Sequence, residues 1–191
     1  MNVQALYDEA RRQGFERLVV GAIIVQGSKV LLLRRTAADF MGGLFELPGG
    51  GVEPQESLLD ALAREVHEET GLTGCEALQY LGAFDYLSES GKRTRQLNFL
   101  VRVNPADPRL SPEHEAAAWV APDEIDSFNV SESVLGVLKT YWEGRQKAMF
   151  PTRPGMWIAR DGLDASGKSE QVPLVAARLR EAGISPTVSR K

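Results

Sequence analysis

The chain has 191 residues, enough for one domain of typical size plus a few dozen further residues. With 22 basic and 26 acidic residues, its net charge of −4 argues against stable nucleic-acid binding through summed positive charge. A hydrophobic fraction of 43% and a charged fraction of 25% are typical of globular chains and exclude wholesale disorder. The single cysteine, Cys75, excludes an intramolecular disulfide and fits a reducing compartment.

No segment of the sequence is predicted to anchor the chain in a membrane. The apolar run at 18–25 is far shorter than the ~20 residues that a spanning helix needs. The first ten residues contain Asp8 and Glu9 and lack the basic region of a signal peptide. We therefore expect a soluble, cytoplasmic protein.

The hydrophobic pattern predicts strands and helices in alternation. An amphipathic helix is expected at 3–13, and a buried strand at 18–25 forms a hairpin with 29–33 through Gly27-Ser28. Glycine-rich loops at 42–43 and 48–51 flank a strand-like segment. The remaining expected elements are a helix at 56–70 that ends at Gly71, strands at 78–86 and 94–103, a loop from Ser111 to Trp119, and helices at 122–127 and 131–145.

The helix expected at 56–70 concentrates acidic residues on one face. Glu65, Glu68 and Glu69 are spaced i, i+3 and i+4, so their carboxylates converge and repel one another. A divalent cation would relieve that repulsion, and oxygen-only ligands favour Mg²⁺ or Mn²⁺. Such ions complete their coordination with water and substrate phosphates, which points to hydrolysis of a phosphate ester or phosphoanhydride.

The longer pattern around these acids carries a family resemblance. The chain contains Gly50-(x5)-Glu56-(x7)-Arg64-Glu65-Val66-His67-Glu68-Glu69-Thr70-Gly71-Leu72. This stretch resembles the box of the Nudix hydrolases at every fixed position, and the resemblance covers residues 17–147. It implies an α/β fold, an α/β/α sandwich with a mixed sheet, in which the box forms a loop–helix–loop.

The resemblance also implies roles for single residues. Glu65, Glu68 and Glu69 would hold the metal, with the backbone carbonyl of Gly49 as a further ligand. Arg64 would orient one of these carboxylates. Glu56 is expected to be structural and to pair with Arg64.

A later acidic segment resembles the one that often completes the family's site. Glu113 is the candidate for an extra metal ligand or general base, with Glu115 second, and the role of base is left divided between Glu65 and Glu113. His114 could reach the site, but we expect an exposed loop histidine without a role.

A second motif follows a linker expected at 148–155. Gly162, Gly167, Lys168 and Ser169 fit the phosphate-binding P-loop pattern G-x-x-x-x-G-K-[ST]. Residues 156–191 resemble the strand, P-loop and first helix of the thymidylate kinase family, although Arg160-Asp161 and Glu170 depart from its pattern. The rest of a kinase is missing, so we expect a strand–P-loop–helix fragment: a fusion that is cut short, or a vestige.

The sequence thus predicts an N-terminal extension (1–16), a Nudix domain (17–147), a linker (148–155) and a partial P-loop segment (156–191). The expected reaction is hydrolysis of a (deoxy)nucleoside triphosphate to monophosphate and pyrophosphate. Nucleotide sugars, ADP-ribose and dinucleoside polyphosphates are alternative substrates. A non-catalytic nucleotide sensor, and a Nudix/nucleotide kinase if the natural chain is longer, are alternatives of another class, and a homodimer is left open.

Overall fold

A computed structural model describes residues 2–37, 42–149 and 178 of the chain. The chain divides into two units, Met1–Phe150 and Pro151–Lys191. Every helix and strand named below belongs to the first unit. Of the second unit, only Arg178 is among the described residues.

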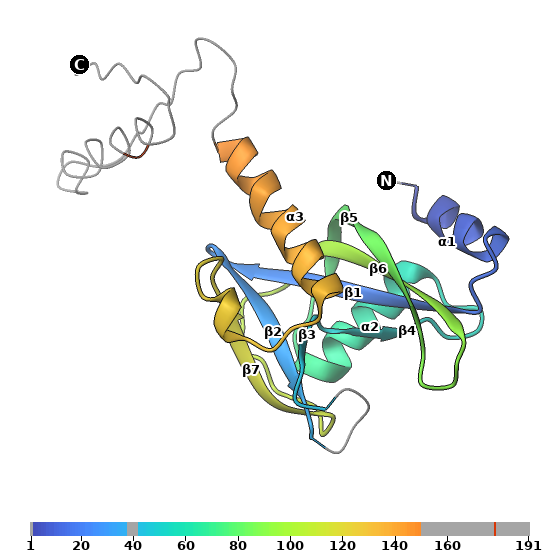
Figure 1. Cartoon of the computed structure of the whole chain (residues 1–191), viewed down its shortest axis with the longest axis horizontal. Helices are drawn as coiled ribbons and strands as arrows, with labels where there is room; N and C mark the ends of the chain where they lie inside the picture. Colours follow the sequence, from blue (N-terminus) through green and yellow to red (C-terminus); the bar gives the residue numbers. More distant parts are fainter. Residues whose placement is uncertain (1, 38–41, 150–177, 179–191) are drawn as a thin grey trace, which may run out of the picture. The chain divides into compact units, whose positions relative to one another are not determined.

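The first unit alternates strands and helices along the chain (Figure 1). Its elements are α1 (Val3–Arg12), β1 (Arg17–Gln26), β2 (Lys29–Arg35), β3 (Phe45–Glu46), β4 (Gly49–Gly51), α2 (Leu58–Thr70), β5 (Glu76–Leu87), β6 (Arg93–Arg102), β7 (His114–Val120), the 3₁₀ helix η1 (Ile125–Ser127) and α3 (Glu132–Met149).

The strands form one mixed, seven-stranded sheet. Its main order is β3-β2-β1-β6-β5, while β4 pairs with β1 and β7 pairs with β2. Strands β1 and β6 run parallel, with Arg17 opposite Thr94, and the other pairings are antiparallel. This confirms the mixed sheet expected from the sequence.

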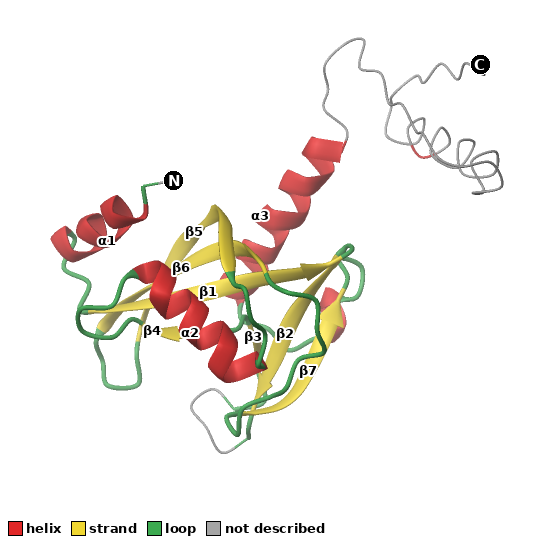
Figure 2. Cartoon of the chain, turned by 180° about the vertical axis from the view of Figure 1, so that it is seen from behind, coloured by secondary structure: helices red, strands yellow, loops and turns green. Residues whose placement is uncertain are grey.

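Alternation along β1 and β2 builds two cores, one on each face of the sheet. Val20 and Ile24 join Leu62 and Val66 of α2 in one core. Ile23 joins the apolar residues of α3 in the other: Val134, Val137, Leu138, Tyr141 and Trp142. Helices α2 and α3 therefore cover opposite faces, as Figures 1 and 2 show.

The helices at 3–13, 56–70 and 131–145 were predicted correctly to within a few residues. The helix expected at 122–127 is only the short η1, Ile125–Ser127. No helix among the described residues is both long and apolar enough to cross a membrane.

Two expected loops are in fact strands. The glycines at 49–51 form β4 against β1, with Gly50 opposite Val20. The segment before Trp119 forms β7 from His114 onward, paired with β2. Its three consecutive alanines, 116–118, carry little of the polar–apolar alternation that identifies a strand.

Candidate active site

Helix α2 is fixed at both ends and along one side. The Ser57 hydroxyl caps its start by accepting a hydrogen bond from Asp60 N at 3.1 Å. Gly71 ends it in the left-handed conformation, with φ 67°, and donates its N–H to His67 O at 2.8 Å. The buried apolar side of the helix consists of Leu58, Ala61, Leu62 and Val66. Side chains on its other face are consequently carried by a rigid support.

The three glutamates of α2 have different surroundings. Glu69 is only 6% exposed, and its Oε2 accepts a hydrogen bond from Gly49 N at 2.8 Å. Glu65 is partly buried and accepts from Arg64 Nη1 at 2.8 Å. Glu68 has an exposed carboxylate that accepts from the same Nη1 at 3.1 Å. One guanidinium therefore supplies the positive charge between two of the three acids.

Arg64 also fixes the loop that precedes α2. Its Nε and Nη2 donate to the two oxygens of Glu56 at 2.8 and 2.9 Å, and Nη2 donates to Gly51 O at 2.9 Å. These hydrogen bonds hold the pKa of Glu56 below its usual value. The expected pairing of Glu56 with Arg64 is present, and it ties β4 to the helix that carries the acids.

Two glycines of β4 leave room for atoms that lie close to the backbone. A Cβ at Gly49 would lie 2.0 Å from Val20 O. A Cβ at Gly50 would lie 2.3 Å from Glu65 Oε1. The backbone of β4 thus lies directly against the carboxylates of Glu65 and Glu69.

Burial raises the pKa of two of the three α2 glutamates. Desolvation raises the pKa of Glu69 to about 8, against the opposing hydrogen bond from Gly49 N, and the charges of Glu46, Glu65 and Glu113 raise it further. Desolvation also raises the pKa of Glu65. A nearby cation stabilises the ionised form of such carboxylates and would lower their raised pKa values.

The carboxylates of the three α2 glutamates supply the oxygen donors that a divalent cation such as Mg²⁺ prefers, but they are not arranged around one in this structure. Within residues 2–37 and 42–149, no three acidic, histidine or cysteine side chains are already gathered as a metal-binding set. Glu65 and Glu68 instead share the hydrogen bonds of Arg64. A cation bound by both acids would compete with Arg64 for their oxygens.

Of the two acids expected from the later segment, Glu113 lies within electrostatic reach of the α2 carboxylates. Its charge contributes to the raised pKa values of Glu65 and Glu69, and its side chain is exposed. Glu115 instead pairs with Arg34 at 3.0 Å.

His114 is not an exposed loop residue, contrary to the expectation from sequence. Its side chain is fully buried at the start of β7. Its Nε2 donates to Glu46 Oε1 at 3.1 Å and lies 3.9 Å from Glu69 Oε1. Glu46 also accepts from Arg35 Nη1 at 2.7 Å. Sequence reasoning missed Glu46 as a neighbour of the site and favoured an exposed position for His114, because a single acid in a short strand and a single histidine carry no pattern.

A cavity of about 440 Å³ is lined by Glu46 and by two glycines of β4, although the three α2 glutamates themselves do not line it. Gly49 and Gly50 line it, as do Phe45 and Glu46 of β3. Its other walls include Phe84, Tyr86 and Gln96 from β5 and β6, and Val134 from α3. The cavity therefore extends from the edge of the acidic site toward aromatic side chains on the α3 face of the sheet.

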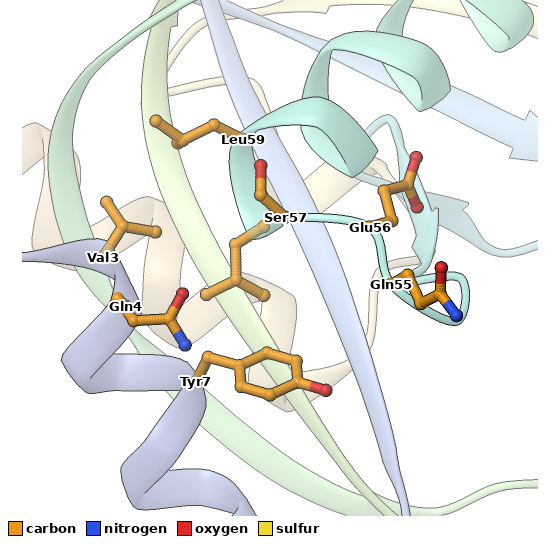
Figure 3. A pocket seen from close by; sticks show the side chains of 8 residues that line it. Val3, Gln4, Tyr7, Gln55, Glu56, Ser57 and Leu59 are labelled. Carbon is orange, nitrogen blue, oxygen red and sulfur yellow. The ribbon is translucent and has the colours of Figure 1, made fainter.

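A second hollow, of about 350 Å³, lies between α1 and the start of α2. Figure 3 shows Gln4 and Tyr7 of α1 facing Ser57 at the start of α2. Glu56 lines this hollow, but its carboxylate is bound by Arg64. The three α2 glutamates do not line it.

The expected P-loop residues Gly162, Gly167, Lys168 and Ser169 lie outside the described residues.

Comparisons with known proteins identify the domain. Residues 16–139 match the model of the NUDIX domain. The CTP pyrophosphohydrolase of Escherichia coli K12 is 31% identical over 123 residues, which are 64% of this chain and 89% of that protein. The human 8-oxo-dGDP phosphatase NUDT18 is 28% identical over 138 residues, 70% of this chain and 41% of that protein.

Among solved structures, the MutT protein of Methanosarcina mazei Go1 superposes with a TM-score of 0.61 at 30% identity. The match covers 69% of this chain and 95% of that protein. The fold, the complete box and the domain match agree, and the chain belongs to the Nudix hydrolase family.

Proposed function

We propose that this chain is a Mg²⁺- or Mn²⁺-dependent pyrophosphohydrolase that converts a (deoxy)nucleoside triphosphate to the monophosphate and pyrophosphate. The observation that carries the proposal is the shared boundary of cavity and acidic site. Gly49 and Gly50 line the cavity, and the same two residues contact Glu69 and Glu65. A nucleoside in the cavity would thereby place its phosphates at the carboxylates of α2.

The residues of the chain have distinct roles in this proposal. Glu65, Glu68 and Glu69 would hold the cation, with the carbonyl of Gly49 as a further ligand. A bound cation would supply charge neutralisation on the phosphates and polarisation of a water molecule. Either Glu65 or Glu113 would accept a proton from the water that attacks phosphorus, and pyrophosphate would leave. Arg64, which donates to Glu65 at 2.8 Å, would orient a carboxylate of α2 through an oxygen that the cation does not take.

The named relatives support nucleotides as the substrate class. One is a CTP pyrophosphohydrolase and another an 8-oxo-dGDP phosphatase. An ADP-ribose pyrophosphatase of Methanocaldococcus jannaschii, 46% identical over 55 residues, matches only 29% of this chain. A triphosphate substrate is therefore our first choice, and ADP-ribose, nucleotide sugars and dinucleoside polyphosphates are the alternatives.

A substrate panel tests the proposal. The full chain is incubated with each nucleoside triphosphate, ADP-ribose, a nucleotide sugar and a dinucleoside polyphosphate, with Mg²⁺ or Mn²⁺, and the products are separated by chromatography. We expect monophosphate and pyrophosphate from at least one triphosphate, and a loss of at least about 100-fold in kcat for Glu69→Gln. Binding without hydrolysis of any compound would overturn the enzymatic proposal in favour of a sensor.

The P-loop motif supports a separate proposal, a second site for nucleotide phosphates. Titration of the full chain with ATP and Mg²⁺ in a calorimeter would show two classes of site. The weaker one should be lost in Lys168→Ala and retained in Glu69→Gln. Identical isotherms for the original chain and Lys168→Ala would overturn this second site.

A further inference from the structure

Two side-chain amides lie next to each other on β6, beside the cavity. Gln96 Nε2 donates to Asn98 Oδ1 at 3.0 Å. Asn98 is fully buried, whereas Gln96 is partly exposed and lines the cavity. The buried amide therefore supports one that a ligand can reach.

The hydrogen bonds of Asn98 determine which way both amides point. Asn98 Nδ2 donates to Gly82 O at 3.2 Å and to Gln96 O at 3.4 Å. Both partners are carbonyls that only accept, so the amino group of Asn98 must face them and its Oδ1 must face Gln96. Gln96 consequently turns its own amino group toward Asn98, and its Oε1 has no donor among the described residues.

A glycine in the neighbouring strand leaves room for this pair. Gly21 lies opposite Asn98 in the parallel pairing of β1 with β6. A Cβ at Gly21 would lie 2.6 Å from both Asn98 Oδ1 and Gln96 Nε2. Any larger residue at this position would displace the amides, so the chain keeps space for them inside a strand where glycine is unfavourable.

The wall around Gln96 suits a flat ring. Phe84 is the direct cross-strand partner of Gln96 and, like Tyr86, lines the cavity. The rings of Phe84 and Tyr86 have centroids 6.1 Å apart. A planar base packed on these aromatic side chains would present its edge to the amide of Gln96.

We propose that Gln96, positioned by Asn98, reads the edge of the substrate's nucleobase and favours bases with an exocyclic amino group. The fixed Oε1 accepts a hydrogen bond from the amino group of cytosine or adenine. It faces a second acceptor when uracil or hypoxanthine presents a carbonyl there. The placement of the base in this cavity rests on the proposed function.

Binding of matched monophosphates without metal tests this inference separately from hydrolysis. CMP and UMP differ in a 4-amino and a 4-oxo group, and AMP and IMP differ in a 6-amino and a 6-oxo group. The full chain in EDTA is titrated with each compound by calorimetry or NMR. We expect the amino member of at least one pair to bind roughly tenfold more tightly, a ratio of the size one good hydrogen bond gives.

Three substitutions test whether the Gln96 amide causes the preference for amino bases. Gln96→Met keeps the length of the side chain without its hydrogen-bonding groups. In this variant the affinities of the amino and oxo members of each pair should agree to within about twofold. Gln79→Met, at an exposed position of β5 that does not line the cavity, is the matched control and should keep the original ratio. Asn98→Leu removes the acceptor of the Gln96 amino group, so Gln96 can turn and present either end of its amide. The affinity ratio of CMP to UMP should therefore fall, while UMP binds at least as tightly as before.

Equal affinities within both pairs in the original chain, or an unchanged preference in Gln96→Met, would overturn the role of Gln96. Absence of binding by all four monophosphates would overturn it too. These results differ from failure of the proposed function. An original chain that prefers the amino bases but hydrolyses no nucleotide would remove the enzymatic proposal and keep Gln96 as the base reader.

Discussion

His114 Nε2 lies 3.1 Å from Glu46 Oε1 and thereby joins β7 to β3 behind the carboxylates of α2. The other ring nitrogen, Nδ1, is 3.4 Å from Ser111 Oγ. The imidazole is fully buried, so both of its polar atoms need partners from the protein. This buried contact connects the segment that carries Glu113 with the strand that leads into the glycines of β4.

Removal of the imidazole should therefore destabilise the fold. We expect His114→Ala to lower the free energy of unfolding by about 1–3 kcal/mol, because it leaves a cavity and takes a buried donor from Glu46. Glu115→Gln, at the next residue of β7, changes only an exposed pair with Arg34 and should cost less than about 0.5 kcal/mol. Urea unfolding in EDTA measures both, and equal midpoints would contradict the buried role of His114.

Much of the fold was predictable because its main elements carry strong periodic patterns. The apolar run of β1 and the 3.6-residue period of α2 are long, and Gly71 marks the end of α2 by its positive φ. Strand β7 was missed because its pairing with β2 comes from tertiary contact, while its run of alanines has no alternation. Strand β4 was missed because three glycines have no side chains to show a face.

The site was predictable only where its residues belong to one element. The spacing of Glu65, Glu68 and Glu69 on a single helix was sufficient to place them on one face. Glu46 and His114 come from strands 68 residues apart in the chain, and only the folded sheet brings them together. That Arg64 bridges Glu65 and Glu68 depends on its rotamer, which sequence spacing does not determine.

A divalent cation should stabilise the folded chain. A ligand that binds only the native state raises its stability in proportion to the logarithm of ligand concentration. We expect millimolar Mg²⁺ or Mn²⁺, added after treatment with EDTA, to raise the Tm by several degrees, since 1 kcal/mol shifts the Tm by ~2–4 °C in a domain of about this size. Glu69→Gln should abolish most of the rise, because the amide cannot ionise and so offers the cation no carboxylate at this buried position.

The matched control for this experiment is Glu89→Gln, which alters an exposed acid outside α2 and should leave the metal-induced rise intact. Differential scanning calorimetry measures the Tm, and the electron paramagnetic resonance signal of free Mn²⁺ measures binding independently of activity. A rise in Glu69→Gln as large as in the original chain would contradict the assignment of Glu69 as a ligand.

We expect alanine to be less well tolerated at Gly50 than at Gly51. A Cβ at Gly50 would lie 2.3 Å from Glu65 Oε1, whereas the nearest atom to a Cβ at Gly51 is Arg17 Nη2 at 3.3 Å, the end of a flexible side chain. Gly50→Ala must therefore displace the Glu65 carboxylate. We expect Gly50→Ala to weaken Mn²⁺ binding at least about tenfold, a cost of roughly 1.4 kcal/mol, and Gly51→Ala to change it less than about threefold. Similar Mn²⁺ affinities for the two variants, by the same resonance titration, would contradict this contact.

The last prediction concerns the attachment of the N-terminal segment to the sheet. Arg95 donates to both oxygens of Asp85, at 2.7 and 2.9 Å, and its guanidinium stacks over the ring of Phe15 at 4.0 Å from the centroid. It also donates to Gln13 Oε1 at 2.7 Å. Asp85 therefore orients the arginine that holds the segment between α1 and β1.

The hydrogen bonds from Arg95 lower the pKa of Asp85 below its ordinary value of 3.8. Because the pKa is lower in the folded state, the contribution of this carboxylate to stability is present above about pH 3.8 and is lost as the pH falls through the folded-state pKa. Asp85→Asn should accordingly destabilise the chain by about 0.2–1 kcal/mol at pH 7, since the pair is partly exposed, and by less near pH 3. Urea unfolding at both pH values measures the difference, with the exposed Asp107→Asn as the control that should show little effect at either pH. A cost of Asp85→Asn that grows toward pH 3 would contradict the pairing.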